Sequence, residues 1–498
     1  MSVPGSKHRS FLWKLASEAM LERGFEPEFS PSVMAAIDAM QDTAPEAGPD
    51  VRDTRELPWC SIDNDDSRDL DQLTVAEPMA NGDIRIMVAI ADVTTRVTDG
   101  SAPDRHARIN TTSVYTPARI FSMLPERLST DLTSLNPGVD RLAFVVEAEI
   151  LANGEVGSSS VYRALVHNHA QLAYPSVGAW LEGKGEIPVA AKAVPALAEN
   201  LRLQDRAARI IEDFRHEQGA LTFAPIEVKA HLRDETVHEL ILDIPNRARG
   251  LIENFMIVAN GVVARFLADH GFPVVRRVIE SPERWERIVD IASHLGTQLP
   301  EQPDARALQA FLTRRRAADP LRFPDLSLSI IKLLGRGQYV ANFPGRSVDG
   351  HFALAVDDYT HSTAPNRRYP DVITQRLVRA ALNGRPCPFE AAELEALALH
   401  CTEKENDAKR VERRLVKSAA ALLLERRIGQ LFDGVITGAG SKGTWVRTFE
   451  PPVEGRIEDD VRALDVGDTV RVKLLRADPR RGYIDFECVG HEPVRRRR

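Results

Sequence analysis

The hydrophobic pattern changes period twice along this chain of 498 residues, and this change restricts the fold more than any other feature. Apolar side chains alternate over residues 84–90 and again over residues 146–150, which predicts strands with a buried face. From residue 252 to residue 266 they recur at i, i+3, i+4 and i+7, which predicts an amphipathic helix. We therefore expect an α+β fold, with a mixed sheet surrounded by helices.

The pattern returns to short strands with Gly-rich turns over residues 433–490, which is typical of a small closed barrel such as the OB-fold. Near the N-terminus, residues 10–40 predict two short helices, with Ser30 as an N-cap and Pro31 in the first helical position. Further helices are expected at 283–297, 304–318, 325–334, 371–383 and 390–430. The predicted division is a small helical unit, in the manner of a helix-turn-helix, with a linker (1–50), an α+β domain (51–432), a barrel (433–490) and a basic tail (491–498).

Charge and cysteine content exclude several classes of protein. The net charge is -8, so a nucleic-acid surface would have to be local. Residues 404–427 carry eight basic and four acidic side chains, which suits either an RNA-facing helix or a solvated helix with pairs such as Glu405 and Lys409. The four cysteines have no CxxC spacing, which argues against a zinc or redox site and fits a reducing cytoplasm. Charged residues interrupt the long apolar stretches, so we expect no membrane segment.

The segment SIDNDDSRDLDQ, residues 61–72, holds five carboxylates within nine positions. Such crowding is unfavourable unless cations neutralise it, and oxygen ligands suit a hard divalent metal. An EF-hand is excluded, because Arg68 stands where that loop needs Gly and Thr74 where it needs Glu. The segment is therefore either a metal site or a solvated acidic turn.

A second segment, YTHSTAPNRRYPD at residues 359–371, places an arginine pair between two prolines. Pro365 and Pro370 restrict the backbone, and Asp371 suits the start of a helix, so we expect a rigid loop that orients guanidinium groups. Arginine binds phosphate bidentately, although a surface pair can also be merely solvated. Together the two segments indicate phosphodiester chemistry.

These two segments resemble motifs of the RNase II/RNase R (RNB) family of exoribonucleases. MLPERLSTDLTSLNPGVDRLAF, LIENFMIVAN and HFALAVDDYTH are similar to further family motifs in the same order, and residues 433–490 resemble its C-terminal S1-type OB domain. The resemblance covers residues 57–490 and implies an RNB catalytic domain followed by an S1 domain. Family members commonly carry two N-terminal cold-shock domains, which we do not expect in the first fifty residues.

The resemblance assigns roles to individual residues. It implies metal binding and catalysis by Asp63, Asp69 and Asp71, and stabilisation of the scissile phosphate by Arg367. The expected RNA-binding residues are Tyr115 and Phe223, which would clamp terminal bases, Tyr174, which would stack deeper in the channel, Glu253, near the RNA 3′ end, and Arg368 of the arginine pair.

The sequence departs from the family pattern at several positions. Gln72 stands where the family usually has a fourth Asp, so one negative charge is missing from the metal site. We expect its carbonyl oxygen to serve as a neutral ligand, with weaker or altered metal binding. The other departures are Ala364, Asn366, Ile279 and Gln375.

The expected activity is processive, hydrolytic 3′-to-5′ degradation of single-stranded RNA to nucleoside 5′-monophosphates. Two magnesium ions (Mg2+), roughly 3.5–4 Å apart and replaceable by Mn2+, would activate water and stabilise the leaving oxygen. We expect a cytoplasmic monomer without an obligate protein partner. Two alternatives stay open, a catalytically weak RNA-binding protein, which Gln72 favours, and a structural scaffold. Degradation of labelled RNA with and without magnesium distinguishes all three.

Overall fold

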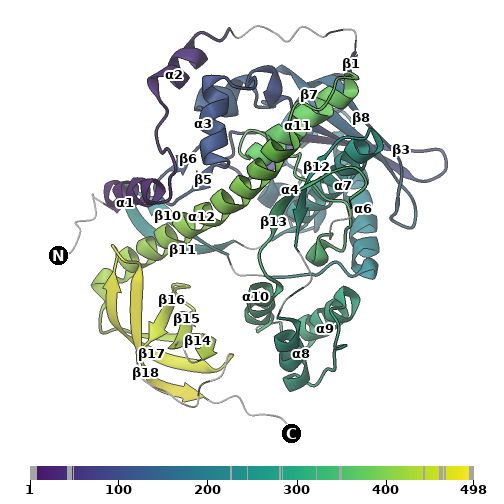
Figure 1. The fold of residues 1–498 in the computed structure, drawn as a ribbon. Helices are drawn as coiled ribbons and strands as arrows, with labels where there is room; N and C mark the ends of the chain where they lie inside the picture. The colour runs from purple at the N-terminus through teal and green to yellow at the C-terminus, as the bar shows by residue number, and fades with distance from the viewer. Residues whose placement is uncertain are drawn as a thin grey trace.

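The computed structural model describes residues 8–492, apart from 42–47, 49, 225–226, 244, 280–281, 283, 321, 347–349, 441–442, 459–463 and 465–466. The predicted basic tail lies almost entirely outside these residues. Figure 1 shows a large sheet-containing body, a long diagonal helix, α12 (Ala391–Leu424), and a small barrel at its lower end. The expected α+β fold is confirmed.

A mixed sheet of seven strands forms the centre of the large body, in the order β1-β8-β7-β4-β3-β2-β9. The outer pairs β1–β8 and β2–β9 are parallel, and the inner pairs are antiparallel. The alternating run at 84–90 forms β4, whose Ile84 pairs with Ile150 of β7. The strands are β1 (Val51–Asp53), β2 (Cys60–Asp63), β3 (Gln72–Pro78), β4 (Ile84–Ala91), β7 (Asp140–Ile150), β8 (Val156–His167) and β9 (Ala170–Ala173).

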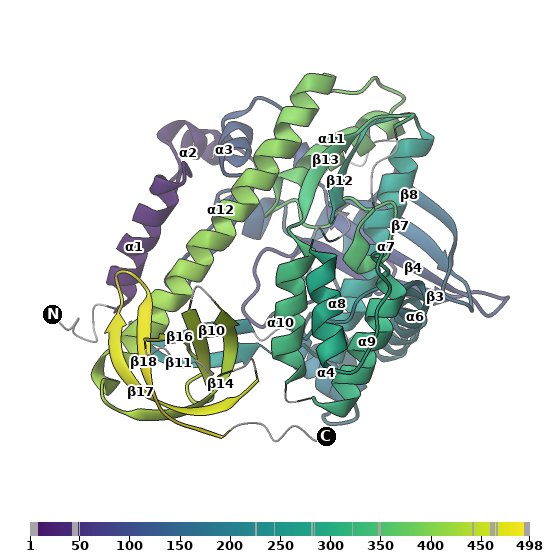
Figure 2. The same ribbon diagram turned by 60° about the horizontal axis from the view of Figure 1, so that its bottom comes forward.

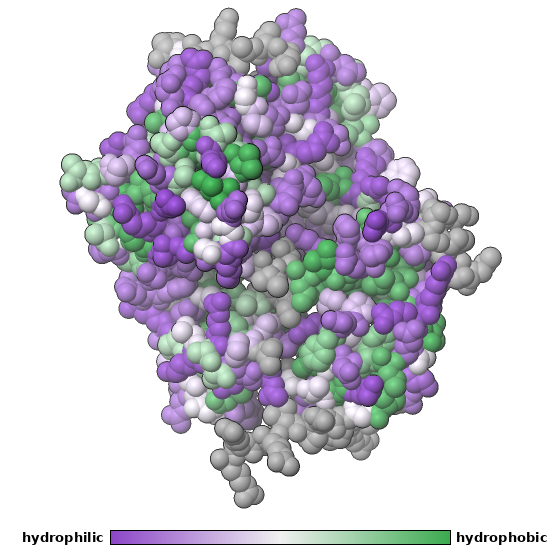
Figure 3. Space-filling view, turned by 180° about the vertical axis from the view of Figure 1, so that it is seen from behind, coloured by the Kyte–Doolittle hydropathy of each residue, from purple (hydrophilic) through white to green (hydrophobic). Residues whose placement is uncertain are grey.

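The predicted amphipathic helix is α7 (Arg247–Asp269), which packs against the sheet together with α6 (Leu197–Gln218). By length and composition α7 could cross a membrane, but 72% of its most apolar window is buried inside the protein. On the face shown in Figure 3, polar side chains cover most of the surface and apolar ones gather in separate patches. The burial of α7 inside the protein identifies it as a core helix.

Most of the remaining elements of the large body are shorter. They are η2 (Val93–Thr95), α3 (Ala102–Asn110), β5 (Val114–Tyr115), β6 (Ile120–Phe121), the π-helix η3 (Arg127–Leu132), α4 (Tyr174–Leu181), α5 (Val189–Ala193), β10 (Glu227–Arg233) and β11 (Thr236–Asp243). After α7 come β12 (Val274–Val278), α8 (Trp285–His294), α9 (Ala305–Ala318), α10 (Phe323–Leu334), β13 (Gln338–Asn342), η4 (Phe352–Leu354) and α11 (Tyr369–Leu382). The five helices expected between residues 283 and 430 are therefore all present.

The C-terminal strands close into a five-stranded barrel, as expected, in the order β14-β15-β16-β18-β17. An ion pair joins the barrel to α10, because Arg447 Nη1 lies 2.7 Å from Asp325 Oδ1 and both side chains are largely buried. The elements are η5 (Glu425–Arg427), β14 (Leu431–Gly440), β15 (Gly443–Thr448), β16 (Glu454–Ile457), β17 (Thr469–Asp478) and β18 (Tyr483–Glu492).

The two N-terminal helices, α1 (His8–Glu22) and α2 (Pro31–Asp38), are present, and Ser30 caps α2 by accepting a hydrogen bond from the Val33 amide. They belong to different cores. The buried face of α1 packs with α12, whereas α2 packs with α3 in the core of the large body. Each helix is thus stabilised by the rest of the chain, and the division into the four predicted segments stays a prediction.

Candidate active site

The acidic segment connects two adjacent strands of the central sheet. Asp63 ends β2 and Gln72 begins β3, so the carboxylates between them lie at one edge of the fold's core. The hydroxyl of Ser67 lies 3.0 Å from Asp63 Oδ2 and 3.4 Å from Asp69 Oδ1. Two of the predicted catalytic carboxylates therefore converge on one hydroxyl. Burial raises the pKa of Asp69, and the charge of Asp63 adds to this effect.

Asp71 is the most deeply buried of the three predicted catalytic carboxylates, with 2% of its surface exposed. Burial raises its pKa to about 8; Arg367 opposes this shift and Asp69 adds to it. Its Oδ1 accepts a hydrogen bond from the Asn366 amide at 2.9 Å, while its buried Oδ2 has no hydrogen-bond partner in the described part of the chain. A buried carboxylate oxygen without a donor is well suited to a cation.

The arginine segment forms the expected rigid loop before α11. Asp371 accepts hydrogen bonds at 2.8 Å from the Ala364 amide and from the Arg368 side chain, which close the loop on itself. The loop is also held by residues 111–113, since the Ser113 amide donates to the Arg367 carbonyl and the Tyr369 amide donates to the Thr111 carbonyl. This support leaves the Arg367 side chain 44% exposed beside Asp71.

Gln72 links the acidic segment to the arginine loop, because its Nε2 atom donates a hydrogen bond to the Thr363 carbonyl. Gln72 thus acts on the loop through its amide nitrogen. The predicted role of its oxygen as a metal ligand stays a prediction.

Two of the predicted aromatic residues lie beside this charged group. Burial raises the pKa of Tyr115 to about 12, and Arg367, Asp69 and Asp71 are among the charges that act on its hydroxyl. Burial also raises the pKa of Tyr174, whose hydroxyl interacts with the charges of Asp63 and Arg367. The structure therefore gathers the three carboxylates, Arg367, Tyr115 and Tyr174 into one site.

The remaining predicted RNA-binding residues lie in other surroundings. Phe223 packs against the cluster formed by α8, α9 and α10. Glu253 is exposed on α7, where its charge acts on Arg215. Arg368 forms an ion pair with the buried Asp371, so its main contact lies within the loop.

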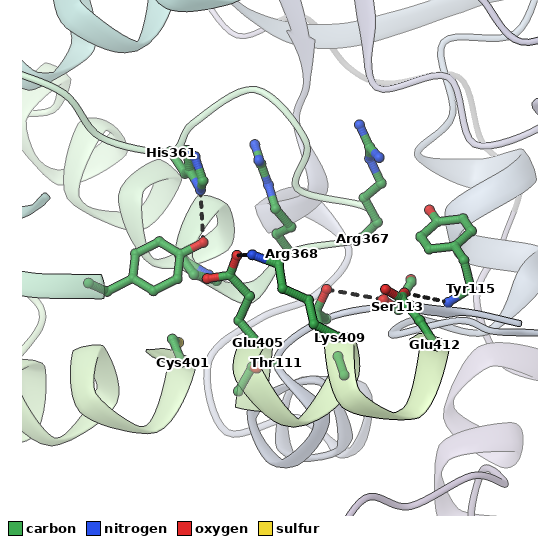
Figure 4. Close-up of a pocket in the computed structure, with 14 residues that line it drawn as sticks. Thr111, Ser113, Tyr115, His361, Arg367, Arg368, Cys401, Glu405, Lys409 and Glu412 are labelled. Carbon is green, nitrogen blue, oxygen red and sulfur yellow. Dashed lines mark hydrogen bonds and ion pairs between the residues drawn. The ribbon is translucent and has the colours of Figure 1, made fainter. Parts of the chain in front are cut away.

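A pocket of about 180 Å³ lies between the arginine loop and α12. Figure 4 shows Arg367, Arg368 and Tyr115 on one side and Glu405, Lys409 and Glu412 of α12 on the other. The predicted pair of Lys409 with Glu405 is confirmed at 2.7 Å. Glu412 also accepts a hydrogen bond from the Tyr115 amide at 2.9 Å, so α12 fixes the strand that carries this aromatic.

The site fits a divalent metal by the chemistry of its donors. Asp71 offers a buried oxygen that accepts no hydrogen bond from the described residues, and Asp63 and Asp69 supply further carboxylates nearby. Among the described residues, no three His, Cys, Asp or Glu side chains are already gathered as a metal cluster. The carboxylates nevertheless form the oxygen-rich donor set that hard cations require.

Sequence reasoning missed several residues that shape this site. Ser67 lies within the acidic segment, four positions after Asp63, and this spacing could have indicated its role. Tyr339 and His361 line the pocket and are joined by a hydrogen bond of 2.8 Å. No local signal indicated Tyr339, because β13 meets the loop only in the folded chain.

Two family models match most of the chain. Residues 51–384 match the RNB domain, and residues 430–489 match the RNase II-type exonuclease C-terminal S1 domain. Ribonuclease R of Thermotoga maritima is 32% identical over 476 residues, which cover 88% of this chain and 65% of that protein. Ribonuclease R 1 of Lactococcus lactis is 29% identical, with coverage of 95% and 61%.

The fold is similar to that of Mycoplasma genitalium RNase R in complex with double-stranded RNA, with a TM-score of 0.85 at 24% identity. That alignment covers 96% of this chain and 83% of the other. The chain spans about three fifths of the length of the curated relatives it matches. Because the RNB match alone covers more than half of the chain, this protein belongs to the RNB family.

Proposed function

We propose that the protein is a hydrolytic 3′-to-5′ exoribonuclease that degrades single-stranded RNA processively to nucleoside 5′-monophosphates. The observation that carries this proposal is the convergence of Asp71 and Arg367, in which a buried carboxylate oxygen without a hydrogen-bond donor among the described residues lies beside a half-exposed guanidinium. Metal-dependent hydrolysis of a phosphodiester needs both groups. The carboxylate serves as a metal ligand, and the guanidinium stabilises the negative charge that develops on the phosphoryl oxygens.

Each part of the site has a role in this reaction. Asp63, Asp69 and Asp71 would hold the divalent metal, which supplies an activated water and stabilises the leaving 3′-oxygen. Arg367 would bind the scissile phosphate, since its side chain is half-exposed and its backbone is held by hydrogen bonds within and around the loop. Tyr115 and Tyr174 would stack on bases near the cut, and Phe223, Glu253 and Arg368 would contact RNA around them. Stacking tolerates any base, so the RNA binds with similar free energy each time it moves forward by one nucleotide, and it can therefore advance.

We propose magnesium as the resident metal, with manganese as a substitute, and Gln72 as a neutral contributor to the site. The relatives named Ribonuclease R and the absence of CxxC pairs support a cytoplasmic enzyme. We further propose that it acts as a monomer on RNA, with no obligate protein partner.

Hydrolysis of 5′-labelled single-stranded RNA tests the proposal directly. With magnesium, the full-length RNA should be replaced by a short 5′-labelled end product with few intermediates, and nucleoside 5′-monophosphates should be released. With EDTA, the RNA should stay intact but bound. The alternative, a weakly catalytic RNA-binding protein, is favoured by Gln72 and predicts binding without turnover at any magnesium concentration. Internal cuts, or 3′-phosphate products, would contradict the proposed reaction.

A further inference from the structure

One buried segment contacts both halves of the active site. It comprises Thr133, Ser134 and Leu135, which directly follow the π-helix η3 and are all buried. The next strand, β7, pairs with β4 in the central sheet, and Figure 2 shows these two strands side by side. We call residues 133–135 the anchor segment. Because buried polar groups need hydrogen-bond partners, its contacts show which parts of the site it holds.

The anchor segment fixes the backbone between two of the predicted catalytic carboxylates. Leu70 lies between Asp69 and Asp71 in the sequence. Its amide donates a hydrogen bond of 2.9 Å to the Ser134 hydroxyl, and its carbonyl accepts one of 2.9 Å from the Leu135 amide. Both polar backbone groups of Leu70 are therefore bound by the anchor segment, which restricts the carboxylates on either side.

The anchor segment is itself held by the central sheet. The Arg141 side chain, on β7, donates a hydrogen bond of 3.2 Å to the Ser134 carbonyl. The Asn168 side chain, directly after β8, donates one of 2.8 Å to the Leu135 carbonyl. The side chains of Leu135 and Leu70 also pack in the same hydrophobic core. The position of the sheet is thus passed to the acidic segment through the anchor segment.

Thr133 connects the anchor segment to the arginine loop. Its hydroxyl oxygen lies 2.5 Å from Oδ1 of Asn366, a side chain that is fully buried. Either orientation of the amide gives one hydrogen bond between the two side chains, because a hydroxyl both donates and accepts. The backbone amide of Asn366 donates to Asp71 Oδ1 at 2.9 Å, and Arg367 is the next residue. Thr133 therefore acts on the loop where it joins the acid to the arginine.

These contacts matter because the charged groups of the site do not hold themselves in place. The carboxylates repel one another until a cation binds, so their positions depend on support from outside the acidic segment. A displacement of about 1 Å in a reacting group can cost about 100-fold in rate. A buried segment that holds both the carboxylates and the arginine can therefore control the rate without touching the substrate.

We propose that Ser134 and Thr133 are positioning residues of the hydrolytic site. Ser134 sets the place of the carboxylates through Leu70. Thr133 sets the place of Arg367 through the side chain of Asn366. This proposal rests on the proposed function, because it explains how the same carboxylates and arginine are kept at one spacing.

The role of Ser134 is tested with Ser134→Ala, which removes the acceptor of the Leu70 amide. Hydrolysis at saturating RNA should fall about 100-fold. The Mn2+ concentration for half-saturation without RNA, measured by electron paramagnetic resonance, should rise about tenfold, since the metal ligands lose their orientation. Asp71→Asn serves as the reference for Mn2+ bound elsewhere. RNA affinity in EDTA should stay within about twofold. Wild-type Mn2+ affinity and a wild-type rate in Ser134→Ala would overturn its role.

The role of Thr133 is tested with Thr133→Val, which keeps the shape of the side chain and is decisive even if Ser134→Ala does not fold. Its kcat should fall about tenfold, whereas KM and the Mn2+ half-saturation should stay within about twofold, because only the arginine side is released. Thr133→Ser restores the hydroxyl and should recover most of the rate.

The matched control for Thr133→Val is Thr94→Val. Thr94 is also buried in the large body, and its hydroxyl donates to Asp92 at 2.9 Å. Two arginines hold the same carboxylate, so Asp92 keeps its place without this hydroxyl. Thr94→Val should therefore hydrolyse RNA as the wild type does. An equal loss of rate in both variants would show that only packing matters and would overturn the proposal.

A double-mutant cycle tests the link between Thr133 and Asn366. Asn366→Leu removes the same hydrogen bond from the other side, while its backbone amide can still donate to Asp71. The double variant T133V/N366L should lose about tenfold in kcat, no more than either single variant, because all three lack one link. A loss of about 100-fold, the product of two independent effects, would overturn the role of Thr133. Failure of Thr133→Ser to recover the rate would do the same.

The metal measurements separate this proposal from the proposed function. A wild type that binds Mn2+ and RNA but hydrolyses no RNA would refute the exoribonuclease activity. The Mn2+ affinities of Ser134→Ala and Thr133→Val would still decide whether the anchor segment holds the carboxylates, because only the first variant should bind the ion more weakly.

Discussion

The Nε atom of Arg367 lies 3.5 Å from the Oδ2 atom of Asp71, an oxygen that has no hydrogen-bond partner among the described residues. Asp71 directly precedes β3, whereas Arg367 belongs to the loop before α11, so the contact joins two segments that are remote in sequence. The Asn366 amide fixes the other carboxylate oxygen. The loop therefore orients both the acid and the arginine.

The first prediction concerns the carboxylate of Asp71. Asp71→Asn keeps the size and the oxygen that accepts from Asn366, but it removes the charge that a divalent metal needs. Hydrolysis should fall by at least about 100-fold, or about 2.7 kcal/mol in the barrier. RNA affinity in EDTA should stay within twofold, because backbone charge and stacking dominate it. The matched control is Asp66→Asn, an exposed carboxylate of the same segment, which should retain full activity. Equal activity of both variants would exclude Asp71 from the site.

The second prediction concerns Gln72 and its hydrogen bond to the Thr363 carbonyl. Gln72→Asp removes the amide donor and adds a negative charge next to the other carboxylates. In EDTA the free energy of unfolding should fall by about 1–2 kcal/mol, since the buried carbonyl loses its donor. With magnesium, the concentration for half-maximal hydrolysis should fall, because the metal gains a charged ligand.

The comparison for Gln72→Asp is Gln72→Asn, which keeps an amide and adds no charge. Urea unfolding in EDTA and a magnesium titration of the rate measure both effects. A variant that is inactive at every magnesium concentration would show that this site is built around the glutamine.

The sequence predicted the elements of the fold well where a period persisted over many residues. The strand β4 ends one residue after the expected alternating run, and α7 begins five residues before and ends three residues after the expected helical run. The N-terminal helices show where local pattern stops being informative. Their existence was predictable, but α1 packs with residues such as Val411 and Leu415 of α12, a contact that no local pattern indicates.

The residues of the site were likewise predictable only where a sequence motif identified them. Asp71 and Arg367 were identified through motif resemblance, whereas Ser67, Glu412 and Tyr339 were not, because their roles depend on contacts formed only in the folded chain. The hydrogen bond from Gln72 to the Thr363 carbonyl was missed for the same reason.

The third prediction is that His351 destabilises the fold at mildly acidic pH, while the raised pKa of Asp71 acts in the opposite direction. Burial lowers the pKa of His351 from 6.5 to about 4, and the charges of Arg277 and Arg215 add to this shift. The folded state thus favours the neutral ring, and the unfolded chain binds the extra proton between these two values. The stabilisation is complete above pH 6.5 and is lost as the pH falls towards 4.

Between pH 7 and pH 5, His351 alone should cost about 2 kcal/mol of unfolding free energy. His361, whose pKa burial lowers well below its usual value, should add to the effect. Urea unfolding at both pH values measures it. His351→Gln should be less stable than the wild type at pH 7, and this difference in unfolding free energy should shrink by about 2 kcal/mol at pH 5. A pH dependence that the substitution leaves unchanged would contradict the assignment.

The fourth prediction concerns discrimination between RNA and DNA. Tyr174 begins α4, and the guanidinium of Arg249 lies 5.4 Å from its ring centre, one helical turn before Glu253 on α7. Tyr174 therefore lies near the face of α7 that carries Glu253, and the RNA contacts proposed for both residues would bring them to a ribose 2′-hydroxyl. The wild type should degrade RNA and bind but hardly cut DNA of the same sequence.

The double variant Tyr174→Ala with Glu253→Ala should cut DNA at a measurable rate while losing some RNA activity. Single-turnover hydrolysis of matched RNA and DNA strands provides the measurement. Equal degradation of both polymers by the wild type would show that these residues do not read the sugar.

The fifth prediction concerns the ion pair between the barrel and α10. Arg447 and Asp325 meet through two contacts, of 2.7 and 3.2 Å, and only 3% of the Asp325 side chain is exposed. Arg447→Met leaves this carboxylate buried without its partner, and the cost should be about 3 kcal/mol of unfolding free energy. Replacing both residues, as Arg447→Met with Asp325→Leu, should recover most of this loss, because apolar side chains of similar size need no counter-ion. Urea unfolding of the wild type, the single variant and the double variant at pH 7 measures both the loss of unfolding free energy and its recovery. If the single and double variants are equally destabilised, packing rather than charge pairing holds the barrel against α10.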